Sequence, residues 1–190
     1  MKSLVISLFF SVLLGACAGT PKISYFVLDA PALPAASVAQ DARTPSILIT
    51  SVTLPDLVDR PQMVVRSGAN RVEILDASRW AQPLKSEVAR VLAACLGREV
   101  GTAKVFLHGQ GMSDAADYRV TLDIQRFDSE PGVAATIEAL WTVRHKGAAL
   151  PQTGRSAIRE AVADDGPAAL AAAHGRALQQ LGKDIAAALR

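Results

Sequence analysis

Residues 118–127 read YRVTLDIQRF, and residues 135–144 read ATIEALWTVR. In both runs apolar side chains mostly alternate with polar ones, which is the period of a β-strand with one face on a core and the other in water. The connecting residues 128–132 read DSEPG, and this proline and glycine are typical of a turn. We therefore expect the two runs to pair as an antiparallel hairpin.

Several other segments are rich in β-branched and aromatic residues and are predicted as strands. They are residues 23–28, 47–52, 62–66, 71–75, 104–108 and 155–162. The run at 47–52 is mostly apolar, which favours a buried central strand. The sequence SGAN at 67–70 is a hairpin turn signal between two of the strands. Residues 31–45 are rich in proline and alanine and are expected to form an irregular connection.

Two helices are predicted. Residues 83–96 carry an apolar stripe at helical spacing, with Pro83 suited to the first turn and Gly97 expected as the C-terminal cap. The second helix is expected from Gly166-Pro167 to about residue 189. The expected fold class is α/β of the α+β type. It is a single domain with a mixed, mostly antiparallel sheet, two main helices packed on it in one layer, and the other sheet face partly open.

The N-terminus has the pattern of a signal peptide. Lys2 precedes the apolar run LVISLFFSVLL at residues 4–14. As a helix this run spans about 16 Å, which is roughly half of the ~30 Å hydrocarbon core of a bilayer. It is therefore too short to cross a membrane and is interpreted as a signal sequence.

The sequence LGAC at residues 14–17 resembles the bacterial lipobox. This resemblance implies cleavage before Cys17 and attachment of fatty acyl chains, such as palmitate, to the new N-terminus. The alternative is an ordinary A-x-A-type cut that leaves Cys17 free. Ala18 replaces the aspartate that retains lipoproteins in the inner membrane, which favours the periplasmic face of the outer membrane. The expected organisation is a signal peptide at 1–16, a lipidated tether at 17–22 and one periplasmic domain at 23–190.

Charge and chemistry exclude several functions. After loss of Lys2 the chain has 19 basic and 18 acidic residues. The basic residues are scattered along the chain, so no nucleic acid partner is expected. Cys95 lies in an apolar stripe and is predicted to be a buried, inert thiol. His108, His145 and His174 have no metal-ligand spacing and are expected to be solvated. The sequence GQGMS at 109–113 lacks the P-loop lysine and is interpreted as a flexible loop. We expect no metal, no cofactor and no enzymatic activity.

The segment LPDLVDRPQ at residues 54–62 has two interpretations. Its prolines stiffen a loop that carries Leu57 and Val58, so it could be a docking surface. Equally, the loop could fold onto its own core, with Asp59 and Arg60 in a local ion pair. The residues alone leave both open.

The mature chain resembles the PqiC family of ABC-type transport auxiliary lipoproteins. The matching blocks are YFVLD at 25–29, LPDLVDRPQ at 54–62 leading into MVVR, NRVE at 70–73, RWAQPL at 79–84 and DYRV at 117–120. The resemblance implies an outer-membrane, non-enzymatic auxiliary subunit of a lipid transport system that maintains envelope integrity. Its implied partners are an MCE-domain protein that spans the periplasm and inner-membrane transporter components. A homo-oligomer would suit a tubular partner, but the sequence does not show one.

The resemblance also supplies the candidate site. Asp59, Arg60, Pro61, Gln62 and Trp80 match its motifs, and they are candidates for a partner interface or for defining the fold. Two other functions stay open. A lipid carrier or chaperone would need an apolar cavity of a few hundred Å³. An envelope hydrolase would need histidines or carboxylates gathered in a cleft.

Overall fold

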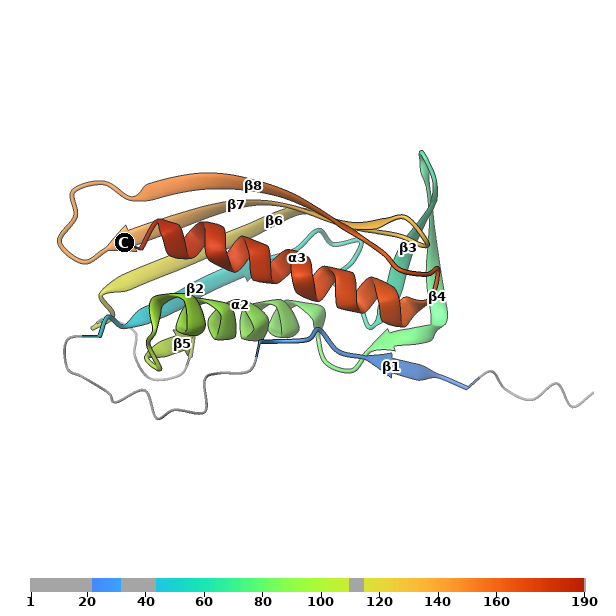
Figure 1. Ribbon diagram of the computed structural model, residues 1–190, viewed down its shortest axis with the longest axis horizontal. Coiled ribbons are helices and arrows are strands. Elements are labelled where there is room, and N and C mark those ends of the chain that lie inside the picture. The colour runs from blue at the N-terminus through green and yellow to red at the C-terminus, as the bar shows by residue number, and fades with distance from the viewer. Residues whose placement is uncertain (1–21, 32–43, 110–114, 190) are drawn as a thin grey trace, which may run out of the picture.

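Two β-sheets and two helices make up the part of the chain that the structure, a computed structural model, describes: residues 22–31, 44–109 and 115–189 (Figure 1). The predicted signal peptide with Cys17, most of the 31–45 connection and most of the glycine-rich segment 109–113 lie outside these residues. The expected α+β fold, with mixed strand pairing and two main helices, is confirmed. Its strands are divided between two sheets.

The larger sheet has five strands in the order β5-β2-β6-β7-β8. The strands are β2 (Ile47–Thr53), β5 (Val105–Leu107), β6 (Tyr118–Glu130), β7 (Ala134–His145) and β8 (Gln152–Ala161). The predicted hairpin is confirmed, since β6 and β7 pair antiparallel from Tyr118 opposite His145 to Glu130 opposite Ala134. β2 is parallel to both of its neighbours. Ile47, Leu48 and Ile49 are at most 4% exposed, as expected for a central strand.

The smaller sheet has the order β1-β4-β3, with β1 (Ser24–Phe26), β3 (Gln62–Gly68) and β4 (Arg71–Trp80). The predicted β3–β4 hairpin is confirmed. β4 extends beyond the predicted 71–75 to Trp80, because β1 pairs with its second half in parallel, from Ser24 opposite Ser78 to Phe26 opposite Trp80. Pairing with a strand that is distant in sequence cannot be seen in the local pattern of apolar and polar residues.

Helices α2 (Leu84–Val100) and α3 (Pro167–Ala187) pack on each other and on one face of the larger sheet (Figure 1). The prediction that Gly97 caps the first helix is wrong. Gly97 is buried within α2, and its carbonyl oxygen accepts the backbone N–H groups of Gly101 and Thr102. The cap is Gly101, whose φ of 72° is the left-handed conformation that glycine adopts without steric cost.

Helices α2 and α3 are in close contact at Cys95 and Gly182. A Cβ atom placed on Gly182 would lie 2.5 Å from the Cβ of Cys95, closer than two carbon atoms can approach. Cys95 is 0% exposed, and burial raises the pKa of its thiol to about 11. The thiol therefore stays protonated and unreactive, as the sequence predicted.

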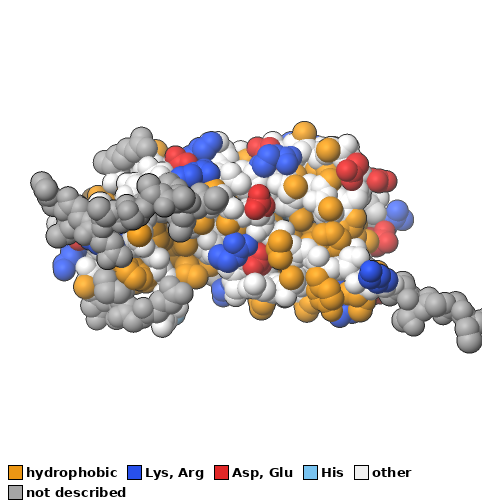
Figure 2. Space-filling view, turned by 60° about the horizontal axis from the view of Figure 1, so that its bottom comes forward, with side chains coloured by type: hydrophobic (Ala, Val, Ile, Leu, Met, Phe, Trp, Pro, Cys, Tyr) orange, Lys and Arg blue, Asp and Glu red, His pale blue; other side chains and the backbone are white. Residues whose placement is uncertain are grey.

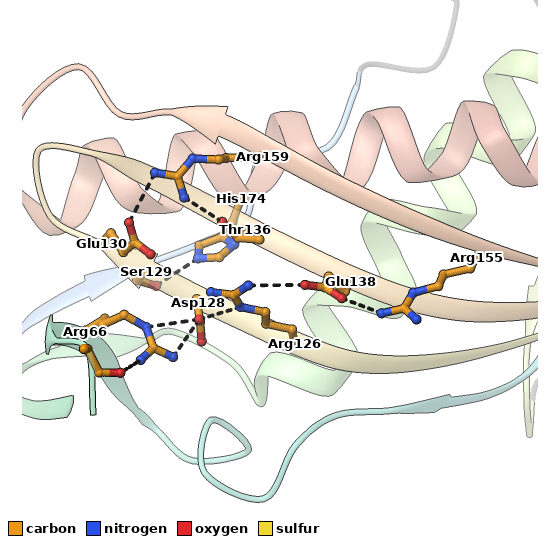
Figure 3. A network of polar contacts seen from close by, with 11 residues as sticks. Arg66, Arg126, Asp128, Ser129, Glu130, Thr136, Glu138, Arg155, Arg159 and His174 are labelled. Carbon is orange, nitrogen blue, oxygen red and sulfur yellow. Dashed lines mark hydrogen bonds and ion pairs between the residues drawn. The ribbon is translucent and has the colours of Figure 1, made fainter. Parts of the chain in front are cut away.

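The sheet face away from the helices carries a ladder of ion pairs (Figure 3). Arg126 bonds both Asp128 (Nε to Oδ2, 2.7 Å) and Glu138 (Nη1 to Oε1, 3.2 Å). Arg155 extends the ladder to β8 through Glu138, and Arg66 of β3 joins it through Asp128 at 2.8 Å. Because Arg66 belongs to the smaller sheet, the ladder links the two sheets across polar side chains that remain partly exposed.

Candidate functional site

The blocks DRP at 59–61 and WAQPL at 80–84, which are far apart in sequence, line one surface pocket of about 340 Å³. Its lining residues are Asp59, Arg60, Pro61, Trp80, Ala81, Gln82, Pro83 and Leu84. Four of the five candidate site residues therefore meet at one place. Gln62 does not line the pocket, because it begins β3 and lies opposite Arg79 in the strand register.

Backbone hydrogen bonds hold the two blocks together. The backbone N–H of Trp80 donates to the carbonyl oxygen of Pro61 at 2.7 Å, and that of Ala81 donates to Phe26 of β1 at 2.8 Å. Within the loop, the N–H groups of Val58 and Asp59 donate to Pro55. Main-chain hydrogen bonds therefore hold the two blocks side by side.

The loop at residues 54–62 combines both of its sequence interpretations. Val58 is only 7% exposed and belongs to the core, whereas Leu57 is 45% exposed. No ion pair joins Asp59 to Arg60 in the described parts of the chain. The loop is therefore anchored on the core through Val58 and the partly buried Leu54, and it leaves Leu57 in solvent.

Trp80 and Leu84 form the inner wall of the pocket. Trp80 is 5% exposed and meets Phe127 edge to face, with ring centroids 6.4 Å apart. Leu84, the first residue of α2, is 1% exposed. Asp59, Pro61 and Gln82 are exposed at the rim. The motif residues therefore divide by position into a buried wall and an accessible rim.

Arg60 is the unusual residue of the pocket. Its Nε atom is buried and has no hydrogen-bond acceptor among the described residues. A guanidinium has only donors and keeps its charge, and an unsatisfied buried donor costs about 1–3 kcal/mol. An acceptor supplied from outside the domain would remove this cost.

A buried carboxylate that the sequence analysis missed lies next to the site. Glu87, in the first turn of α2, has a side chain only 1% exposed. Its Oε2 accepts the backbone N–H of Leu28 at 3.1 Å and Arg90 Nη2 at 2.8 Å. Arg90 Nη2 also donates to the carbonyl oxygen of Leu28 at 2.6 Å. This group, the Glu87–Arg90–Leu28 clasp, ties the chain after β1 to helix α2.

The histidines do not form a shared site. His108 directly follows β5 and His145 ends β7, and both are exposed, as expected. The prediction of a solvated His174 is wrong: this residue is 0% exposed and stacks on Phe127 with ring centroids 3.8 Å apart. α3 packs on the sheet through this side of the helix, so the imidazole enters the core.

Ser129 and His174 lie 2.8 Å apart (Oγ to Nε2), the spacing of a nucleophile and its base (Figure 3). Ser129 is only 7% exposed, and no described residue bonds His174 Nδ1 to orient the ring. A substrate has no access to such a pair, so the contact is structural. The described residues contain no group of three potential metal ligands and no helix long and apolar enough to span a membrane.

Burial makes His174 a source of acid sensitivity. Burial lowers the pKa of its imidazole from 6.5 to about 3, while the field of Asp128 acts in the opposite direction. Between pH 6.5 and pH 3 the His174 imidazole is protonated in the unfolded chain and neutral in the folded chain. Its contribution to the free energy of unfolding is therefore fully present above pH 6.5 and is lost as the pH falls toward 3. We expect a loss of about 2 kcal/mol between pH 8 and pH 5. Urea unfolding of the wild type and of His174→Gln at several pH values checks this. In the His174→Gln variant the free energy of unfolding should vary much less with pH than in the wild type. An equal change with pH in both proteins would contradict the prediction.

Two solved structures have this architecture. A crystal structure of an uncharacterized protein superposes with a TM-score of 0.71 at 16% identity, covering 89% of this chain and 99% of that one. A Xanthomonas campestris protein assigned to the family DUF330 gives a TM-score of 0.68 at 20% identity, covering 86% and 92%. The PelC dodecamer from Paraburkholderia phytofirmans is more distant, with a TM-score of 0.46 at 13% identity, covering 85% and 95%.

The chain therefore has the same α+β fold as the first two of these solved structures. It belongs to the family of ABC-type transport auxiliary lipoprotein components, whose family model matches residues 26–186. The resemblance read from the sequence is thereby confirmed. No protein of curated function matched the chain.

Proposed function

We propose that this protein is a periplasmic lipoprotein, anchored to the outer membrane through Cys17, and a non-enzymatic auxiliary subunit of an MCE-type lipid transport system. Family membership supports the auxiliary role in transport. The lipobox-like LGAC at 14–17 and the following Ala18 support the anchor and its membrane. In this role the domain docks a periplasm-spanning MCE-domain partner, and it acts through binding rather than through a chemical step.

The observation that carries the proposal is the pocket formed by the two motif blocks. Residues 59–61 and 80–84 come from different parts of the chain, yet they share one accessible rim. Trp80 and Leu84 account for packing, but packing alone does not require the exposed Asp59, Pro61 and Gln82. A partner that covers the rim gives these exposed residues a role.

Arg60 indicates which group the partner supplies. Its buried Nε needs an acceptor, and the pocket lining is otherwise largely apolar. A carboxylate or a backbone carbonyl flanked by a small apolar side chain would fill both needs. Arginine in a partly desolvated pocket is also a frequent centre of binding energy in protein interfaces.

The test is recovery of the partner from membranes. The tagged full-length lipoprotein is purified from gently solubilised membranes, and co-purifying proteins are identified by mass spectrometry. We expect an MCE-domain protein with the wild type and about tenfold less of it with Arg60→Ala, because a central arginine typically dominates such an interface. Arg60→Lys should also lose recovery, since lysine lacks the planar donor fork.

The matched control is Arg155→Ala. Arg155 is an exposed arginine on the sheet face that carries the ion-pair ladder. Its removal should leave recovery unchanged, with folding of every variant verified by circular dichroism. Absence of any MCE-domain protein from the wild-type sample would overturn the proposed partner. Phospholipid in its place would favour a lipid carrier.

A further inference from the structure

The segment around β1 has an unusual outward face. Phe26 and Leu28 point inward, and Leu28 is 1% exposed. The alternate residues point outward: Ile23 is 40% exposed, Tyr25 63% and Val27 55%. We call Ile23, Tyr25 and Val27 the outer face of β1. An edge strand in water normally carries polar or charged side chains there, so three large apolar residues need an explanation.

These side chains do not stand alone on the surface. Figure 2 shows hydrophobic side chains gathered over β1, next to the point where the described chain begins. Apolar side chains grouped on a surface and bordered by charge typically mark a contact with a partner or a membrane. Whether a partner or a membrane covers the outer face of β1 depends on which of them lies near this end of the chain.

The chain itself places a membrane near this face. Only four residues separate Cys17 from Lys22, the first described residue. Even fully extended, this tether reaches about 18 Å. If the lipid is on Cys17, the start of β1 therefore lies within about this distance of the bilayer surface.

The side chains also fit the interfacial zone of a bilayer. Tyrosine has an apolar ring and a polar hydroxyl, and it is enriched where headgroups meet acyl chains. Lys22 precedes the outer face, and Arg79 lies beside Tyr25 in the parallel register of β1 and β4. These cations suit anionic headgroup phosphates. Counting along the chain from Lys22, the first carboxylate is Asp29, which lies beyond Val27 at the end of this segment farthest from Cys17.

We propose that the outer face of β1 lies in the headgroup region of the membrane and fixes the orientation of the domain on the lipid surface. The inference rests on the lipid anchor at Cys17 given under the proposed function. In this orientation the β1 end of the domain faces the bilayer. The β7–β8 connection, at the opposite end of the molecule in Figure 1, points away from it.

Fluorescence quenching by brominated lipid tests the orientation. Tyr25→Trp places a reporter in the outer face of β1. Leu150→Trp places a matched reporter in the β7–β8 connection, where Leu150 is 81% exposed. Each full-length lipoprotein is reconstituted into phosphatidylethanolamine–phosphatidylglycerol vesicles with or without dibrominated phosphatidylcholine. The wild type supplies the signal of Trp80 and Trp141, which is subtracted.

We expect brominated lipid to quench the added signal of the Tyr25→Trp variant by about half or more, because interfacial side chains reach about 5–10 Å into the bilayer. The added signal of the Leu150→Trp variant should stay unchanged. Flotation of the same vesicles tests the anchor separately. Tyr25→Trp protein that floats without being quenched overturns the orientation and leaves the anchor intact. A blue-shifted but unquenched reporter in that variant would show that protein covers the outer face instead. Protein that does not float overturns the anchor and the orientation together.

Discussion

Glu87→Ala is expected to lower the free energy of unfolding by about 3 kcal/mol, because it breaks the Glu87–Arg90–Leu28 clasp. The substitution leaves the backbone N–H of Leu28 buried without its acceptor and removes the counter-charge of Arg90. It also opens space beneath the first turn of α2, where Glu87 is 1% exposed. For a domain of this size the melting temperature should fall by about 10 °C, measured by calorimetry.

Glu99→Ala on the same helix is the matched control. Glu99 pairs with Arg98 at 3.0 Å, but both side chains are partly exposed. Surface pairs of this kind contribute at most about 1 kcal/mol, so this variant should melt near the wild type. If the two variants lose the same stability, the buried clasp has no special role and the prediction fails.

Gly182→Val should destabilise the domain by about 3 kcal/mol or more, because the new side chain has no room at the crossing of α2 and α3. A Cβ atom at this position already comes within 2.5 Å of the Cβ of Cys95. Both atoms are attached to helix backbone, so relief requires the helices to move apart. Chemical denaturation with urea measures the loss.

Two further variants separate crowding from helix propensity. Ala172→Val changes an exposed position of α3 and should cost only a few tenths of a kcal/mol. The double variant Gly182→Ala with Cys95→Gly moves the small residue to the other helix and should recover part of the stability that Gly182→Ala loses. A Gly182→Val protein as stable as the wild type would rule out the tight crossing.

The elements with strong local periodicity could be predicted from the sequence. The alternation in β6 and β7 and the apolar stripe of α2 each reflect one side of an element facing the core. The division into two sheets could not be predicted. It depends on the parallel pairing of β1 with β4 and of β2 with β5 and β6, whose partners lie far apart in the chain.

His174 and Glu87 show why residue type can mislead. His174 follows Leu170 by four residues, and Glu87 follows Leu84 by three, so both lie on apolar stripes. The polar side chain of His174 led to a prediction of solvent exposure, whereas its position on the apolar stripe places it in the core. The burial of such groups depends on partners such as Ser129 and Leu28, which only the folded chain brings close.

The candidate site was predicted in part. Family motifs supplied Asp59, Arg60, Pro61 and Trp80, which the structure brings to one pocket. Gln62 belongs to the same motif but lies outside the pocket, because β3 begins there. The unsatisfied Nε of Arg60 could not be predicted, since it depends on what surrounds the side chain in three dimensions.

The clasp also determines how the domain would bear mechanical load. Any pull transmitted from Cys17 enters the fold at the start of β1, and a pull along that strand loads its lateral hydrogen bonds to β4 together, in shear, instead of peeling them one by one. Immediately after β1, both backbone polar groups of Leu28 are held by α2. Resistance to force is governed by the rate of unfolding. The short strand β1 and the clasp together would therefore set how fast the domain unfolds when force is applied through the lipid on Cys17.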